Sequence, residues 1–388
     1  MKIKTAILGY GRSGSTLHAD PIEKLSDFEL TAVCDIDANA KEKAYNRFKC
    51  RIYDDYLEML QKETLDLVVI VTRNNQHCRM TCNCLKSGKN VLVTKPWAIN
   101  VAEAEEMIKT SKASEKMLLP WLPARWGCDL LRLRELIASG VIGKVFQVRR
   151  SEFSFGIRHD WQTSKKFNGG YLLNWGPHLV DQSVQLVGKP VKSVYGEMKQ
   201  IINPGDVEDV FFAVMKTEDD VTIVSEYNIG SAKLPNWIIQ GDKGTIYVKA
   251  TEIEIHQAFF PDTVDPTPYG NELKTHVIND SIHGTNMITM TNRYGDSMVI
   301  YPHIARAIRG EEQYMVTLES ALNLTKLLDA IRKSHETGQA IYLTDEHHEK
   351  VKTRLLSAGH TKPRAAGKQG DFIFEREGVN DAHFVEPP

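Results

Sequence analysis

Apolar residues come in short runs over the first 120 residues, and these runs alternate with segments that have helical spacing. The runs are residues 3–8, 28–35, 65–71, 90–93 and 116–120. Between them, segments such as 38–48 and 99–115 have the character of helices. Strands that alternate with helices are typical of a parallel sheet covered by helices on both faces. We therefore predict a doubly wound α/β domain over residues 1–121.

The pattern changes after residue 121. Residues 130–144 have apolar positions at helical spacing and predict a helix. Beyond His178 come runs rich in β-branched and aromatic residues, namely VKSVYGEM, VFFAVMKT, VTIVSEYNIG, WIIQGDKGTIYVKA and TEIEIHQ. Such runs, broken by Gly, Asp and Asn, predict a mostly antiparallel sheet. We expect a second α/β domain over residues 122–345.

Three further segments complete the pattern. Residues 318–338 predict an amphipathic helix that Gly338 closes. Residues 257–290 contain several Pro, Asp and Asn residues, so we expect a long loop or insertion there. Residues 346–388 are polar and form a C-terminal extension, which we expect to be poorly ordered or to wrap a neighbouring subunit.

Composition narrows the class of protein. The 388 residues are 42% hydrophobic and 25% charged, with a net charge of −2. This balance gives no reason to expect a nucleic acid or a membrane surface as partner. No apolar run reaches the roughly 18 residues of a membrane-spanning helix. The first residues enter a strand pattern without an export signal, so we expect a cytoplasmic protein.

The six cysteines are sparse and form no disulfide framework, which fits a reducing compartment. His77, Cys78, Cys82 and Cys84 lie close enough together to suggest zinc. Cys78 and Cys82 would share a helix face, but Cys84 would point away, and no CxxC pair exists. We therefore expect buried or inert thiols and no metal site.

The first strand leads into a GxGxxG motif, Gly9-Tyr10-Gly11-Arg12-Ser13-Gly14. In a dinucleotide-binding motif the first glycine makes a tight turn, the second lets the backbone approach a pyrophosphate, and the third allows close helix packing. Asp35 ends the second strand, where an acid accepts hydrogen bonds from the adenosine ribose. A carboxylate there repels a 2′-phosphate and favours NAD over NADP, although Arg12 could soften that preference. The alternative is a structural glycine turn with Asp35 as a helix cap.

Lys95 stands in VLVTKPWAIN, at the carboxyl end of a predicted parallel strand. Ligands bind at that edge of such sheets. A lysine held there can hydrogen-bond a substrate hydroxyl, and desolvation would lower its own pKa. The alternative is a solvated lysine at a strand end.

The stretch GGYLLNWGPHLVDQ, residues 169–182, places a histidine after a Gly-Pro pair. We expect His178 in the first turn of a helix, whose positive end would keep the imidazole neutral and ready to accept a proton. Asp181 and Gln182 share its helix face, and either could orient the ring. The alternative is a histidine that packs in a core or caps a turn.

These motifs, in this order, resemble the Gfo/Idh/MocA family of glucose–fructose oxidoreductase and inositol 2-dehydrogenase. VTRNNQH (71–77) is similar to the family's T-P-N-x-x-H, and CLKSGKNVLVTKP (84–96) to its A-G-K-H-V-L-x-E-K-P. GGYLLNWGPHLVD is similar to G-G-x-L-x-D-x-G-x-H-x-x-D, and residues 318–343 resemble the family's closing helix and strand.

The resemblance implies a Rossmann domain followed by a domain with a large open-faced sheet that builds dimers or tetramers. It implies a nicotinamide cofactor and a sugar, cyclitol or related substrate. Carried over by position, Lys95 and His178 are the catalytic pair, and Asp181 is the last acid of the motif. The cofactor set then adds, beyond the glycine motif and Lys95, the residues Thr72, Asn74, His77 and Arg125.

Three residues depart from the family pattern: Arg73 replaces Pro, Thr94 replaces Glu, and Asn174 replaces Asp. The aspartate contacts substrate in many family members and helps to set the charge of the histidine. Asn174 can donate and accept hydrogen bonds but carries no charge. The departure leaves Lys95 and His178 in place.

The sequence therefore predicts an NAD-dependent dehydrogenase that oxidises a ring hydroxyl of a sugar, cyclitol or glycoside. Lys95 polarises the hydroxyl, His178 accepts its proton, and Asn174 and Asp181 assist. Trp161, Arg158, Trp175 and Asn174 are candidate substrate contacts, since aromatic planes with a few polar groups suit a sugar. Ordinary packing is the alternative for the tryptophans. Two other functions remain open: glycoside cleavage through transient oxidation and elimination, and a non-catalytic cofactor sensor.

Overall fold

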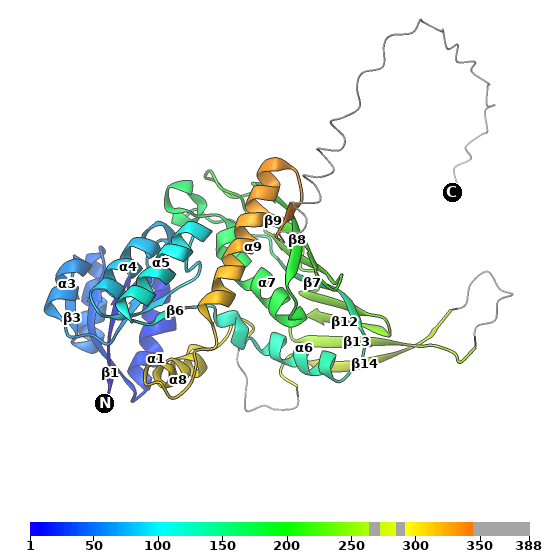
Figure 1. Cartoon of the computed structure of the whole chain (residues 1–388), viewed down its shortest axis with the longest axis horizontal. Coiled ribbons are helices and arrows are strands. Elements are labelled where there is room, and N and C mark those ends of the chain that lie inside the picture. Colours follow the sequence, from blue (N-terminus) through cyan, green and yellow to red (C-terminus); the bar gives the residue numbers. More distant parts are fainter. Residues whose placement is uncertain (264–271, 285–291, 344–388) are drawn as a thin grey trace, which may run out of the picture. The chain divides into compact units, whose positions relative to one another are not determined.

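The computed structural model describes residues 1–263, 272–284 and 292–343. These residues build two sheets (Figure 1). The expectations for the C-terminal extension, residues 346–388, lie outside the described residues. Among the described helices, none combines the length and the apolar character needed to cross a bilayer.

The first sheet has six strands, all parallel, in the order β3-β2-β1-β4-β5-β6. The strands are β1 (Ile3–Leu8), β2 (Phe28–Cys34), β3 (Arg51–Tyr53), β4 (Leu67–Ile70), β5 (Asn90–Val93) and β6 (Leu118–Pro120). This is the strand order of a Rossmann fold, which confirms the predicted doubly wound sheet. The order reverses between β1 and β4, and ligands bind at the carboxyl edge of such a switch point.

Helices connect these strands. They are α1 (Ala19–Lys24), α2 (Ala38–Phe48), α3 (Tyr56–Lys62), α4 (His77–Lys86) and α5 (Val101–Ser114). The Asp37 side chain accepts a hydrogen bond from Asn39 N and caps α2, and the Asn100 side chain caps α5 in the same way through Glu103 N. A five-residue π-helical segment, η1 (Gly14–His18), joins the glycine motif to α1.

The second sheet has nine strands in the order β14-β13-β12-β11-β7-β10-β9-β8-β15. They are β7 (Val145–Phe153), β8 (Val191–Lys199), β9 (Val210–Thr217), β10 (Thr222–Asn228), β11 (Trp237–Gly241), β12 (Gly244–Lys249), β13 (Glu252–Phe259), β14 (Lys274–Ser281) and β15 (Ile341–Tyr342). Every pair is antiparallel except β7 with β10. The predicted mostly antiparallel sheet is therefore confirmed.

Two strands of this sheet differ from the expectations. The loop expected over residues 257–290 is wrong in part, because β13 continues to Phe259 and pairs with β14. Residues 264–271 and 285–291 of that segment lie outside the described residues. The central strand β7 was not expected. Its polar residues Arg150 and Ser151 are fully buried, so its pattern does not alternate as that of a half-buried strand does.

The α-helices in the described part of the second half are α6 (Cys128–Ala138), α7 (Tyr171–Val187), α8 (Ser297–Ile308) and α9 (Leu318–Thr337). α7 packs on β7 and β10, and α9 packs on β8 and also on α7 and α5 (Figure 1). The helix α9 ends as predicted, with Gly338 in the left-handed conformation. Helices α7 and α9 thus lie beside each other on the second sheet, and α9 also reaches α5 of the first domain.

Candidate active site

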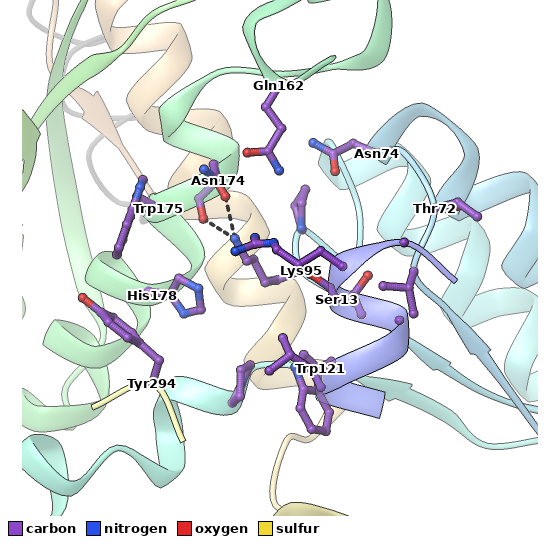
Figure 2. A pocket seen from close by; sticks show the side chains of 18 of the residues that line it. Ser13, Thr72, Asn74, Lys95, Trp121, Gln162, Asn174, Trp175, His178 and Tyr294 are labelled. Carbon is purple, nitrogen blue, oxygen red and sulfur yellow. Dashed lines mark hydrogen bonds between the residues drawn. The ribbon is translucent and has the colours of Figure 1, made fainter. Parts of the chain in front are cut away.

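A cavity of about 710 Å³ lies where the carboxyl ends of β1, β4 and β5 face helix α7. Figure 2 shows Lys95, Asn174 and His178 directed into it from opposite sides. The cavity brings together most of the residues predicted from the sequence, namely Gly11, Arg12, Ser13, Gly14, Thr72, Asn74, Lys95, Arg158, Trp161, Asn174, Trp175 and His178. Groups that are far apart in the chain therefore share one site.

The glycine motif has the geometry of a phosphate-binding turn. Gly9 has φ +93°, and a Cβ there would lie 2.6 Å from Val71 O. A Cβ on Gly14 would lie 2.0 Å from Gly9 O, so the third glycine allows the close packing of helix on strand. A Cβ on Gly11 would meet no atom within 4 Å, which leaves open space beside the backbone. The motif fits a pyrophosphate in the way that the spacing predicted.

Asp35 lies at the carboxyl end of β2, outside the lining of the cavity. Its two carboxylate oxygens accept hydrogen bonds from Tyr10 N, at 2.6 Å, and from Asp37 N, at 2.8 Å. The carboxylate thus braces the glycine motif. Each oxygen can still accept a further hydrogen bond, which a ribose hydroxyl could donate.

The predicted residues after β4 have two different roles: two line the cavity, and one holds the backbone. Thr72 and Asn74 line the cavity, and Asn74 Nδ2 donates a 2.7 Å hydrogen bond to Asn168 O. His77 lies outside the lining and bridges two backbone carbonyls, with Nδ1 2.8 Å from Pro96 O and Nε2 3.1 Å from Thr72 O. Burial lowers the pKa of His77. Its visible contacts hold the backbone that carries Thr72 and Lys95.

Lys95 is partly buried in the lining of the cavity, and its hydrogen bonds in the described part of the chain are accepted by neutral atoms. Its Nζ donates to Asn174 O and Asn174 Oδ1, both at 2.7 Å (Figure 2). Burial, together with the charges of Arg158 and Arg12, lowers the pKa of Lys95 to about 7. The family's aspartate would place a negative charge where Asn174 stands, and this chain lacks it.

The positive charge of Arg12 influences ionisable groups that line the cavity. Its charge lowers the pKa values of both Lys95 and Asp160. The guanidinium thus interacts with the groups around Lys95, and its hydrogen-bonding neighbours do not include Asp35 in the described part of the chain. This placement gives no support to the idea that Arg12 softens the cofactor preference at Asp35.

His178 lies in the middle of α7, which begins at Tyr171, so its expected place in a first helical turn is wrong. The helix contains Pro177, which cannot donate to the preceding turn. Burial, then the charges of Lys95 and Arg150, lowers the pKa of His178 well below its usual value. The imidazole is therefore neutral because it is desolvated, and the positive end of a helix is not the cause.

Asp181 makes no hydrogen bond to the His178 ring in the described part of the chain, contrary to the expectation that it could orient that ring. Its oxygens accept bonds from Arg125 Nε and Nη2, at 2.9 and 2.8 Å, and both side chains are buried. Arg125 also donates to Ser320 Oγ at 2.8 Å, and neither member of the pair lines the cavity. Gln182, the other candidate, bonds Arg150 Nε and backbone carbonyls.

Of the tryptophans near the predicted site, some line the cavity and others do not. Trp161 and Trp175 line the cavity, and the Trp175 ring stacks on Tyr227 with centroids 4.9 Å apart. Arg158 also lines it and pairs with Asp160, with Nη2 2.6 Å from Oδ2. Trp126, near a motif position, lies outside the lining and packs against His303 and Tyr314.

Sequence reasoning missed several cavity residues, above all Tyr294. Its ring lies near the His178 ring (Figure 2), with the two centroids 5.2 Å apart. Its hydroxyl donates a 2.9 Å hydrogen bond to Glu152 Oε2. Trp121, Gln162 and His18 also line the cavity. Tyr294 stands alone in a polar segment without a motif, so no local signal marks it. His18 lies four residues after the last glycine of the motif, and that spacing is a signal that could have been used.

Comparison with known proteins gives a consistent result. Residues 3–120 match the model described as the oxidoreductase family with an NAD-binding Rossmann fold, and residues 130–247 match the GFO/IDH/MocA C-terminal domain. The D-glucoside 3-dehydrogenase of Escherichia coli K12 is 30% identical over 357 residues, which cover 88% of this chain and 97% of that protein.

Two further proteins extend the comparison. The scyllo-inositol 2-dehydrogenase (NADP(+)) IolW of Bacillus subtilis 168 is 24% identical, with 88% of this chain and 96% of that protein covered. The crystal structure of an NAD-binding protein from Listeria innocua superposes with a TM-score of 0.76 at 26% identity, covering 90% of this chain and 99% of that one. The chain therefore belongs to the Gfo/Idh/MocA family of oxidoreductases.

Proposed function

We propose that the protein transfers a hydride between NAD and a secondary ring hydroxyl of a sugar, cyclitol or glycoside. The observation that carries the proposal is the shared cavity, in which the glycine motif, Lys95 and His178 meet. The names of the relatives above, a glucoside dehydrogenase and an inositol dehydrogenase, support the substrate class. NAD, when bound, would take the hydride.

Lys95 is the group that polarises the hydroxyl. Its ammonium is held at a fixed position by two hydrogen bonds to Asn174, so it can present its third proton to a substrate oxygen. Because Lys95 is partly buried, that hydrogen bond is formed largely away from bulk water, where charge-assisted contacts are stronger. An alkoxide that develops on the substrate would be stabilised there.

His178 is the proton acceptor. Its lowered pKa keeps the imidazole neutral at neutral pH, so a lone pair is free to accept the hydroxyl proton. Nδ1 has no hydrogen-bond partner among the described residues. The ring is positioned instead by packing against Trp175 and Tyr294, with centroids 6.0 and 5.2 Å away.

Gly11, Ser13 and the start of η1 would hold the pyrophosphate of the cofactor. The open space beside Gly11 supports this assignment, and Thr72 and Asn74 line the cavity toward the reacting end. Asp35 favours NAD, because a 2′-phosphate would meet its negative charge. We expect tighter binding of NADH than of NADPH, measured by quenching of protein fluorescence, and equal affinities would contradict this part of the proposal.

The test is a steady-state assay of cofactor reduction, followed by the absorbance of reduced nicotinamide. Purified protein with excess NAD is given free sugars, inositols, and aryl or C-linked glycosides in turn. We expect reduction with one of these classes. His178→Ala should lower kcat/KM by about 10²- to 10⁴-fold, the usual contribution of a general base. His276→Ala is the matched control, since His276 is exposed on β14.

Two outcomes would overturn the proposal. Release of an aglycone without accumulation of reduced cofactor would indicate cleavage through transient oxidation and elimination. NADH binding without turnover of any class, and a biological effect unchanged in Lys95→Ala, would indicate a sensor. An unchanged kcat/KM in His178→Ala would remove His178 from the mechanism but would leave the dehydrogenase activity standing.

We also propose a homodimer or homotetramer that works in a reducing compartment such as the cytoplasm. All six cysteines are free and buried thiols, which supports the compartment. The face of the second sheet away from α7 carries large side chains such as Tyr195, which is 42% exposed, and this supports self-association. Light scattering on the purified protein tests the oligomer, and a monomer at micromolar concentration would contradict it.

A further inference from the structure

Two thiols and a carboxylate meet between helices α4 and α5, outside the lining of the cavity. Cys78 and Cys82 are one turn apart on α4, and Glu106 comes from α5. The ligand atoms of these three residues all lie within 4.8 Å of one another. Cys78 Sγ lies 3.7 Å from Glu106 Oε2. A cation placed among them would be in reach of all three donors after small side-chain movements.

The cluster is enclosed on the side of the thiols and open on the side of the carboxylate. Cys78 is 8% exposed and Cys82 is 3% exposed, whereas Glu106 is exposed. A cation could therefore enter past Glu106 and reach two sulfur atoms that are shielded from water. The same arrangement leaves one coordination position on the solvent side for a water molecule.

The local charges favour a cation. A hydrogen bond from Cys78 lowers the pKa of the Cys82 thiol, and Thr110 Oγ donates to Cys82 Sγ at 3.5 Å. The hydrogen bond with Cys82, burial, and the negative charges of Glu103 and Glu106 raise the pKa of Cys78. The carboxylates of Glu103 and Glu106 thus place negative charge beside the two thiols, and a divalent cation would compensate it.

We propose that Cys78, Cys82 and Glu106 form a binding site for a soft divalent cation of the zinc and cadmium class. Two thiolates and one carboxylate are donors that such cations accept in tetrahedral geometry. Binding forms two metal–sulfur bonds and one metal–oxygen bond and releases the two thiol protons to solvent. The site was not expected from the sequence because its third donor comes from a different helix.

The experiment is equilibrium dialysis of the full-length, reduced protein against Cd²⁺. We expect about one bound Cd²⁺ per chain, with the ultraviolet charge-transfer absorption of cadmium thiolates. Cys78→Ser and Cys82→Ser should each lose both the bound equivalent and the absorption. Cys84→Ser is the matched control, because Cys84 is buried on the same helix but is not part of the cluster. It should bind as the unchanged protein does.

A serine variant that folds poorly would lose Cd²⁺ for a trivial reason, so a second variant is needed. Glu106 is exposed, and Glu106→Gln should leave folding intact but weaken Cd²⁺ binding about tenfold or more. Cd²⁺ should also raise the melting temperature of the unchanged protein and of Cys84→Ser. The proposal is overturned if the unchanged protein binds no stoichiometric Cd²⁺. It is also overturned if Glu106→Gln and Cys78→Ser each bind Cd²⁺ as tightly as the unchanged protein does.

Discussion

Helix α7 carries two buried polar groups, one turn apart, in opposite environments. Asp181 is paired through two hydrogen bonds with Arg125, so both charges are compensated. His178 has an unpartnered Nδ1 among the described residues, and nearby Lys95 is bound only by the neutral oxygens of Asn174. The first region therefore has compensated charges, whereas the second keeps polar groups without a charged partner, as the proposed chemistry requires.

The largest expected change in the free energy of unfolding comes from removing the Asp181 carboxylate, which compensates Arg125. Asp181→Ala leaves the Arg125 guanidinium buried without its partner, which should lower the free energy of unfolding by about 3–5 kcal/mol. Urea unfolding measures this change. The control is Glu58→Ala, which breaks the exposed pair with Lys62 and should change the free energy of unfolding little. A similar small loss in Asp181→Ala would mean that the two regions do not differ as described.

For Lys95, in contrast, we expect a substitution to increase the free energy of unfolding. Lys95→Met should abolish turnover yet raise the free energy of unfolding at neutral pH by about 1–2 kcal/mol, because it removes a partly buried charge that has no counterion among the described residues. The pKa of Lys95 falls from 10.5 in the unfolded chain to about 7 in the folded one. The unfolded chain therefore binds more protons between these values, and the stability of the unchanged protein rises with pH across that window.

The advantage of Lys95→Met should consequently be full below pH 7 and shrink toward pH 10.5. Urea unfolding at several pH values measures this trend. A destabilised Lys95→Met variant, or an advantage that does not depend on pH, would show that Lys95 is compensated by groups other than those seen here.

A negative charge beside Lys95 should make the two regions more alike. Asn174→Asp places a carboxylate at the Nζ and should raise the pKa of Lys95 by about one unit, or about 1.4 kcal/mol. If protonated Lys95 is needed to polarise the hydroxyl, the alkaline limb of kcat/KM should move up by the same amount. Asn174→Ser, which adds no charge, is the control. An unmoved limb in Asn174→Asp would exclude Lys95 as the group that titrates there.

The smallest effect on stability and turnover is expected from a change at Tyr294, which packs against His178. Tyr294→Phe keeps the ring against His178 but removes the hydroxyl that donates to Glu152. The loss of one such hydrogen bond should lower stability by about 0.5–1.5 kcal/mol. Because the ring contact remains, kcat/KM should fall less than tenfold, about the same energy. Tyr294→Ala, which removes the ring, should reduce kcat/KM further. Equal rates in the two variants would show that the ring does not position His178.

Local patterns were enough to predict the first sheet and its glycine motif. The turn at Gly9 requires a positive φ, and Gly14 allows a contact that any side chain would block. The glycines that this geometry requires stand within one short motif, so the sequence alone reveals them. The place of Lys95 follows in the same way, since a short apolar run and a proline fix where β5 ends.

What failed depended on distant partners. The strand β7 was missed because Arg150 and Ser151, which are polar, are buried by contacts with Gln182 and Asn236. The helix α7 was expected to begin near Pro177, because proline is common in a first turn, yet it begins at Tyr171. Nothing adjacent to Asp181 reveals that its partner is Arg125, which is far away in the chain.

The sequence by itself determined the Rossmann domain and the family, and it named Lys95 and His178 as candidates, because backbone demands and motif order are carried by contiguous residues. Only the tertiary structure decided which polar groups are compensated and which are left reactive. That choice depends on burial and on charges brought together from separate segments, as with Arg125 and Asp181 or Lys95 and Asn174. Desolvation is a property of the packed molecule, and no single segment encodes it.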